Sequence, residues 1–411
     1  MKQIVIVGGG AAGLAAAITA AREAPEARVI VLERLDRVGK KILATGNGRC
    51  NLTNMGAGPG HYFSVGKRPP QAVLAGMTPD SVLWFFASLG LLCREEDEGR
   101  VYPYCRQAGM VLDVLLAELE RLNIEVHCGS AVSSIRREKR GLTVRTAAGE
   151  TFPATAVILT CGGRAAPRLG SDGSGYALAA ALGHSCSPLY PALTAFRCQM
   201  PGMAGLKGIR ADAGLTLMAG ERVLGRVTGE LQFTEYGLSG IPAMQLSGRL
   251  ARLKKGEKCT AVVDLFPDWQ QEALFRELKA RQEGHRTLET LLLGTVHKRL
   301  AWTAMKSAGL PALSTDCGKI SIEQLRRLAE TLKHWSFPVT GVQGWDNAQV
   351  TAGGVPLEEL VPETLESRRT PGLYLAGELL DLHGDCGGFN LHWAWCSGIR
   401  AGKAAAGRTR T

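Results

Sequence analysis

The first 33 residues hold the pattern that most limits how this chain can fold. A β-branched run, Ile4 to Val7, leads into Gly8-Gly9-Gly10-Ala11-Ala12-Gly13, and an alanine-rich stretch predicted to be helical follows. A second apolar run, Val29 to Leu32, ends in Glu33, twenty residues after the last glycine of the turn. A strand, a glycine turn, a helix, a strand and an acid at this spacing predict the first unit of a dinucleotide-binding α/β domain.

Each part of this turn has a physical task. Gly8 permits the tight turn, Gly10 lets a pyrophosphate approach the backbone, and Gly13 allows the helix to pack closely on the strand. The start of the helix presents free N–H groups to phosphates. Glu33 is placed to accept hydrogen bonds from a ribose hydroxyl. The alternative is a glycine-rich turn in an ordinary strand–helix–strand unit.

Composition narrows the class of protein. A length of 411 residues predicts two or three domains. Glycine makes up 51 of these 411 residues, a larger share than the usual one of about 7%. The net charge of +10 would suit an anionic partner, but the basic clusters are mixed with glutamate and carry no interleaved aromatic residues, so nucleic acid is not the expected partner. No two of the eleven cysteines form a C-x-x-C pair, so no metal site is predicted.

The sequence also gives expectations about location. Its start runs directly into the first apolar strand, without the pattern of a secretory signal peptide. No apolar run reaches the roughly 18 residues that spanning a membrane needs. The scattered cysteines fit a reducing compartment. We therefore expect a cytoplasmic protein with a small-molecule substrate and no membrane span, and the sequence leaves the oligomeric state open.

The domain organisation follows from changes in sequence character. Residues 1–190 and 339–411 are predicted to form one discontinuous α/β domain. Residues 191–260 read as a β-rich inserted subdomain, with 336–352 as a segment that would pair with it, and residues 261–335 as a helical subdomain. Strand-like segments at 125–128, 132–136, 142–146 and 156–160 predict a small antiparallel meander laid against the main sheet.

Other glycine-rich segments predict further contacts with the same ligand. Residues 39–54 are polar and have no apolar period, so they are expected to be a loop. The apolar run 156–160 ends in Cys161-Gly162-Gly163, where we expect the backbone to pass close to a cofactor, with Gly162 in contact. Near the C-terminus, a strand at 372–376 precedes a predicted helix at 391–405. The start of that helix would favour negative charge on a flavin ring.

Taken in order, these blocks resemble those of a known family. VIVGGGAAGLAAA, GKKILATGNGRCNLTN, LQFTEYGLSG, TAGGV and LYLAGELLDLHGDCGGFNLHWAWCSG are similar to blocks of the BaiN-like FAD-dependent oxidoreductases. That family includes bile-acid enone reductases and proteins named aminoacetone oxidases, and it is more distantly similar to the fumarate-reductase group. The resemblance implies a two-piece Rossmann-like, glutathione-reductase-like FAD domain with an inserted β-barrel-like and helical part.

The resemblance also implies the FAD contacts, residue by residue. It places the phosphates on Gly8, Gly10, Ala11, Ala12 and Gly13, the adenosine ribose on Glu33, and a main-chain adenine contact near Val126 or His127. It places Lys41, Asn47, Arg49 and Cys50 along the flavin, Gly377 and Glu378 at the ribityl–phosphate region, and Gly388, Asn390 and Leu391 at the isoalloxazine edge.

The expected reaction is hydride transfer from flavin N5 to a conjugated C=C of an apolar ketone, such as a steroid or bile-acid enone. Candidate proton donors are Glu235, Tyr236 and His383, with Arg49 as a clamp for an anion or carbonyl. The family usually has histidine at Glu235 and aspartate at His383. Without a second GxGxxG, NAD(P)H is expected as a transient electron donor. The alternatives are a flavin oxidase of small amines and an RNA-binding or RNA-modifying flavoprotein.

Overall fold

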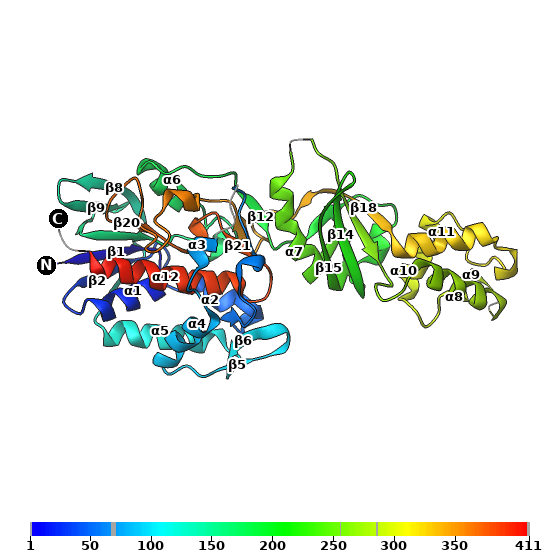
Figure 1. The fold of residues 1–411 in the computed structure, drawn as a ribbon, viewed down its shortest axis with the longest axis horizontal. Coiled ribbons are helices and arrows are strands. Elements are labelled where there is room, and N and C mark those ends of the chain that lie inside the picture. Colours follow the sequence, from blue (N-terminus) through cyan, green and yellow to red (C-terminus); the bar gives the residue numbers. More distant parts are fainter. Residues whose placement is uncertain (1, 67–70, 255, 285–286, 409–411) are drawn as a thin grey trace. The chain divides into compact units, whose positions relative to one another are not determined.

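The computed structural model of the chain describes residues 2–66, 71–254, 256–284 and 287–408 (Figure 1). It divides into two compact units, one of residues 1–191 with 348–411 and the other of residues 192–347. The predicted second boundary at 339 falls inside a strand of the second unit, β18 (Trp335–Val342), because that strand pairs with β13 (Phe196–Cys198) and β17 (Cys259–Asp264). Residues 339–347 therefore belong to the second unit.

A parallel sheet forms the centre of the first unit. Its strand order is β20-β11-β1-β2-β7, and each neighbouring pair runs parallel. Apart from Val126 on the edge strand β7, the apolar strand residues are buried on both faces, as expected of a parallel sheet covered on both sides. The strands are β1 (Gln3–Val7), β2 (Arg28–Leu32), β7 (Glu125–His127), β11 (Ala156–Leu159) and β20 (Leu373–Leu375).

Two helices, the blue α1 (Ala11–Glu23) and the red α12 (Phe389–Gly407), run beside each other in the first unit (Figure 1). Glycine makes this possible, since a Cβ on Gly398 would lie 2.2 Å from the backbone oxygen of Ala12, and one on Gly402 would lie 2.4 Å from that of Ala16. The two ends of the chain are therefore packed together backbone to backbone.

The remaining elements of the first unit surround this core. The meander lies in contact with β1 and β11, and three further small sheets form among the described residues, β3-β6-β5, β21-β4 and β12-β19. The strands are β3 (Thr53–Asn54), β4 (Tyr62–Phe63), β5 (Cys93–Glu95), β6 (Arg100–Pro103), β8 (Val132–Glu138), β9 (Gly141–Thr146), β10 (Thr151–Ala154), β12 (Tyr190–Ala192), β19 (Val350–Ala352) and β21 (His383–Gly384). The helices are α2 (Lys40–Ala44), α3 (Gln71–Leu74), α4 (Pro79–Ser88), α5 (Ala108–Arg121) and α6 (Ser174–Ala181).

Two local predictions for this unit were wrong. The segment 125–127 is not part of the meander, since it adds to the main sheet by pairing parallel with β2, with Val31 opposite Val126. The segment 156–159 also belongs to the main sheet, where it pairs parallel with β1. The meander consists of β8, β9 and β10. The segment 39–54 is not simply a loop, because Lys40–Ala44 forms the short helix α2, which packs on α5 and so buries Ile42.

The second unit combines a closed barrel with a group of helices. The barrel runs β13-β16-β15-β14-β17-β18 and closes between β18 and β13. Its core contains the packed rings of Phe233, Trp335 and Phe337. The further strands are β14 (Arg210–Ala219), β15 (Arg222–Phe233) and β16 (Gly237–Gly240), and the helices are α7 (Ile241–Ser247), α8 (Gln271–Gly284), α9 (Leu288–Leu291), α10 (Lys298–Ser307) and α11 (Ile322–Lys333).

The start of α11 shows how local sequence sets a helix boundary here. Ser321 accepts a hydrogen bond from the backbone N–H of Gln324, whose side chain in turn accepts one from the backbone N–H of Ser321. This reciprocal capping satisfies two N–H groups that a helix start otherwise leaves unpaired. The expected two-piece Rossmann-like fold with a barrel-like and helical insert is confirmed.

Candidate functional site

The glycine turn after β1 leads into a helix start that is open to an anion. Gly8 has φ +108° and donates its N–H to the Leu32 oxygen at 2.8 Å, while a Cβ on Gly13 would lie 1.9 Å from the Gly8 oxygen. A Cβ on Gly10 would meet nothing within 4 Å. Helix α1 has no side-chain cap and no acid in its first turn, so its first N–H groups are available to phosphate.

Glu33 is fixed at the end of β2, beside this turn. One carboxylate oxygen accepts the Gly9 N–H and the other accepts the Leu35 N–H, each at 2.8 Å. The side chain is buried, and an ionised carboxylate has about four acceptor positions, so two remain for a ligand. Val126, on the neighbouring edge strand β7, is partly exposed. This arrangement suits a ribose hydroxyl and an adenine.

A network around Lys41 joins four segments that are apart in the sequence. The Lys41 ammonium donates to Glu378 at 2.7 Å and to the Ala165 oxygen at 3.2 Å. The other Glu378 oxygen accepts both the N–H and the hydroxyl of Thr351 at 2.9 Å. The Thr351 hydroxyl oxygen also accepts backbone N–H groups from Arg164 and Ala165. Sequence reasoning missed Thr351 as an individual residue, although it begins the TAGGV block.

Two predicted glycines lie beside this network. Gly377 has φ +73°, and a Cβ there would lie 2.9 Å from the Cβ of Ala12 in α1. Gly162 has φ +71°, and a Cβ there would lie 2.8 Å from the Ser171 hydroxyl oxygen. Both positions need glycine for conformation as well as for space.

The loop from Thr45 to Cys50 is held in an unusual shape. Asn47 and Cys50 have φ values of 55° and 59°, a region that costs a side chain about 1–2 kcal/mol. Cys50 is fully buried, and burial raises the pKa of its thiol to about 12, so the thiol is neutral. The Arg49 guanidinium lies 4.6 Å from the centre of the Tyr102 ring and 3.9 Å from Glu96. Such strain is typical of functional segments.

The start of α12 forms the second open helix end. Gly388, with φ +102°, precedes the helix, which has no side-chain cap and no acid in its first turn. The Asn390 side chain does not extend the site, since its amide accepts from Gly384 N–H at 2.8 Å and donates to the Gly384 and Asp385 oxygens. It fixes the loop before the helix. Leu391 is partly buried in the adjoining core.

The packing of α1 and α12 sets the distance between the two helix ends. Gly398 meets Ala12 and Gly402 meets Ala16, so the helices run in the same direction. Helix α12 therefore begins eight residues, or about 12 Å of helix, before the level at which α1 starts. FAD separates its pyrophosphate from its ring by the ribityl chain. Two open helix ends in this arrangement fit the two electron-rich parts of one FAD molecule.

Asn51 and His392 are buried near the start of α12, and sequence reasoning missed both. The Asn51 carbonyl oxygen Oδ1 is shielded from solvent and accepts no hydrogen bond within the described ranges. His392 is 1% exposed, and its Nδ1 lies 2.8 Å from the Thr53 hydroxyl. Burial lowers the pKa of His392 to about 4, so its ring is neutral at pH 7. The signal for both residues was their place in the GNGRCNLTN and GGFNLHWAW blocks.

The predicted catalytic residues, three proton donors and the clamp Arg49, are divided between the two units. Arg49 and His383 belong to the first unit, where His383 is buried with its ring centre 5.8 Å from that of Phe63. Glu235 and Tyr236 lie in the turn between β15 and β16 of the second unit. Glu235 is half exposed and paired with Lys207 at 2.8 Å, and Tyr236 is exposed. Which of them reaches a substrate stays a prediction.

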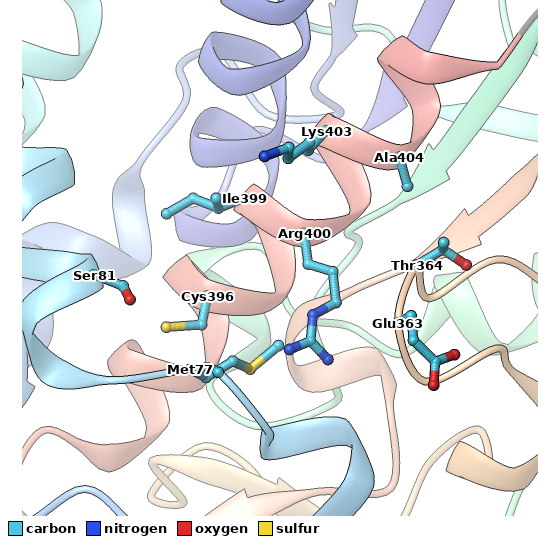
Figure 2. Close-up of a pocket in the computed structure, with 10 residues that line it drawn as sticks. Met77, Ser81, Glu363, Thr364, Cys396, Ile399, Arg400, Lys403 and Ala404 are labelled. Carbon is cyan, nitrogen blue, oxygen red and sulfur yellow. The ribbon is translucent and has the colours of Figure 1, made fainter.

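A cavity of about 390 Å³ lies elsewhere, along α12 (Figure 2). Its wall includes Met77, Glu363, Cys396 and Arg400, and none of the predicted site residues lines it. Arg400 already donates to the backbone oxygens of Val73, Ala75 and Pro362. That arginine therefore ties the segment at residues 73–75 and the backbone at Pro362 to the helix.

Two classes of feature are missing from the residues that the structure describes. No helix there is long and apolar enough to cross a membrane. No group of three or more histidine, cysteine, aspartate or glutamate side chains in those ranges is arranged to hold a metal ion.

Comparisons with known proteins cover nearly the whole chain. Residues 2–404 match the HI0933-like protein Rossmann domain. The chain is 41% identical over 411 residues to a 3-dehydro-bile acid delta(4,6)-reductase of Clostridium scindens, covering 99% of this chain and 100% of that one. It is 30% identical to a ribosomal RNA dihydrouridine synthase of Escherichia coli, covering 96% and 95%. A 3-ketosteroid-delta4-(5alpha)-dehydrogenase from Rhodococcus jostii superposes with a TM-score of 0.48 at 17% identity, covering 99% and 97%.

Proposed function

Because the chain belongs to the HI0933-like family of Rossmann-domain proteins, we propose that it is an FAD-dependent reductase of carbon–carbon double bonds conjugated to a carbonyl. The observation that carries this proposal is the 41% identity, over the full length of both chains, to a 3-dehydro-bile acid delta(4,6)-reductase. The preferred substrate is accordingly an apolar enone or dienone of the steroid or bile-acid kind.

The site residues support the cofactor part of this proposal. The open start of α1 binds the pyrophosphate, and Glu33, held by two backbone N–H groups, orients the adenosine ribose. Lys41, Glu378 and Thr351 fix the walls of the ribityl region. The start of α12 favours negative charge on the ring beside it. When bound, FAD supplies the hydride, and the substrate receives a proton in the same reduction.

The proposed proton donor is one of the residues predicted from the sequence. Tyr236 and Glu235 lie in an exposed turn of the second unit, where a substrate can reach them from solvent. His383 is buried in the first unit, and Arg49 is held by Tyr102 and Glu96 as a cation suited to a carbonyl or an enolate oxygen. We propose NAD(P)H as the electron donor and the cytoplasm as the compartment. The eleven free cysteines support the second point.

A second candidate is reduction of uridine in ribosomal RNA. It is favoured by the 30% identity to the E. coli ribosomal RNA dihydrouridine synthase over 96% of this chain. The chemistry is closely related, because the uracil C5=C6 bond is conjugated to the C4 carbonyl. The charge distribution also supports it, since residues 192–347 carry 21 Lys and Arg against 15 Asp and Glu, an excess of six.

One experiment separates these candidates. The purified holoprotein is reduced anaerobically with NADH or NADPH and then offered a steroid 4,6-dienone or uridine-containing ribosomal RNA. In a separate arm the oxidised holoprotein, without NAD(P)H, is offered small amines and then air. Faster flavin reoxidation with the dienone, together with the saturated product, supports the first candidate. Dihydrouridine formed in RNA without dienone turnover would replace it by the second. Reduction of the oxidised flavin by amines in the absence of NAD(P)H, followed by peroxide release in air, would overturn both, as would protein that takes up no FAD.

A further inference from the structure

Asn51 carries a polar atom that the folded chain does not use. It lies between Cys50 and β3, and its residue exposure is 8%, so it is more than nine-tenths buried. Its Oδ1 has no hydrogen-bond partner among the described residues and is closed off from solvent. A buried acceptor without a donor is destabilising, so its presence needs an explanation.

The position of this oxygen is fixed against the start of α12. A Cβ on Gly388, the residue that precedes the helix, would lie 2.8 Å from Asn51 Oδ1 and 2.5 Å from the Thr53 oxygen. The helix that follows has no side-chain cap, so the N–H groups of its first turn lack intrahelical partners. An unused acceptor therefore lies beside a row of unused donors.

Two neighbouring asparagines show that this is specific to Asn51. Asn54 donates to the Glu98 and Gly387 oxygens and accepts from the Gly56 N–H. Asn390 makes three hydrogen bonds to the loop before α12. The side-chain amides of Asn54 and Asn390 are therefore hydrogen-bonded within the chain, whereas Asn51 Oδ1 has no donor among the described residues.

We propose that Asn51 Oδ1 accepts the hydrogen bond of flavin N3–H, while the first turn of α12 donates to the adjacent C2 carbonyl. This inference rests on the proposed FAD-dependent function. The oxidised isoalloxazine ring has one N–H donor, N3–H, and carbonyl acceptors on each side of it. A single buried acceptor next to helix N–H donors has the complementary pattern. Asn51 is thus the residue that recognises the pyrimidine edge of the flavin.

The test compares FAD with 3-methyl-FAD, which lacks the N3 proton, by titrating the deflavinated full-length protein. We expect the wild-type protein to bind FAD at least tenfold more tightly than 3-methyl-FAD. In Asn51→Ala, FAD affinity should fall about tenfold, equivalent to about 1.4 kcal/mol. The preference for FAD over 3-methyl-FAD should also shrink at least fivefold. The flavin midpoint potential should shift in the variant, because the hydrogen bond bears on the ring itself.

Asn54→Ala is the matched control, with the same change in the same segment at an amide already paired within the chain. It is expected to keep the wild-type preference ratio. Equal binding of both flavins by the wild-type protein would overturn the inference, and that measurement needs no variant. Full preference in Asn51→Ala, or an equal loss in Asn54→Ala, would also overturn it. Wild-type protein that binds neither flavin would instead defeat the proposed function.

Discussion

Replacing Gly398 by alanine tests whether the close packing of α1 and α12 builds the site. The added Cβ would lie 2.2 Å from the Ala12 oxygen and 3.0 Å from its Cα and carbonyl carbon, whereas ordinary contact begins at 3.4 Å. The obstacle is backbone, which cannot rotate away as a side chain can. The two helices must therefore move apart by about 1 Å, in a part of the core that is fully packed.

The size of the effect follows from two opposing contributions. Overpacking of this kind costs about 1–3 kcal/mol, and a contact with rigid backbone belongs at the upper end of that range. Alanine in place of glycine within a helix stabilises that helix by about 1 kcal/mol, which offsets part of this cost. We expect a net loss of about 2 kcal/mol in the free energy of unfolding, or roughly 4–8 °C in the melting midpoint of a domain of this size. FAD binding should weaken as well, because the proposed flavin end of the site lies at the start of α12.

The assay is thermal and urea unfolding of the apoprotein, together with FAD titration. Gly407→Ala is the matched control in the same helix, since a Cβ there meets nothing within 4 Å. It should be neutral or slightly stabilising. If Gly398→Ala were as stable as the wild-type protein and bound FAD equally well, the argument from helix packing would be wrong.

Three further outcomes are expected. Lys41→Met leaves Glu378 without its ammonium partner and should weaken FAD binding about tenfold. A flavin titration measures this change, and an unchanged affinity would show that Lys41 does not contribute to the site. The pKa of His392 is lowered to about 4 in the folded chain from 6.5. Between these two pH values the unfolded chain therefore binds a proton at this residue that the native chain does not bind. The free energy of unfolding of the wild-type protein should therefore fall by about 3 kcal/mol between about pH 6.5 and pH 4. Urea melts of His392→Asn should lack most of this pH dependence. An equal pH dependence in that variant would contradict its assignment to His392. Finally, FAD at about a hundred times its dissociation constant should stabilise the protein by about 2.7 kcal/mol, and an unshifted melting curve would count against the cofactor.

Much of the cofactor-binding half of the fold could be predicted from the sequence. The β-branched run of β1, the turn at Gly8 and the helix after it are each determined by neighbouring residues. Glu33 lies at the end of β2 as its spacing predicts, and the glycines before α12 mark a second turn into a helix. These are short-range signals, because strand propensity, a positive φ and a helix start depend on a few adjacent residues.

Features that depend on distant partners were not predictable in the same way. The pairing of β7 with β2 instead of the meander is decided by which strand edge is free, and α2 forms because its apolar side chain packs against α5. The hydrogen bonds of the Asn390 side chain to the loop at Gly384 likewise depend on how that loop folds, while its expected contact with the flavin stays a prediction. In each case the local sequence allows more than one outcome, and tertiary packing selects one.

The sequence by itself determined that one end of this chain has a dinucleotide turn and the other a glycine-flanked helix. Only the tertiary structure decided how the two combine. Gly398 and Gly402 contact Ala12 and Ala16 across nearly the whole chain length, and this contact sets the offset between the two open helix ends. Likewise, the free acceptor Asn51 Oδ1 supports a ligand contact only because folding places it beside Gly388. Backbone contacts at such sequence separation leave no periodicity or local motif, because their geometry exists only once both segments have folded.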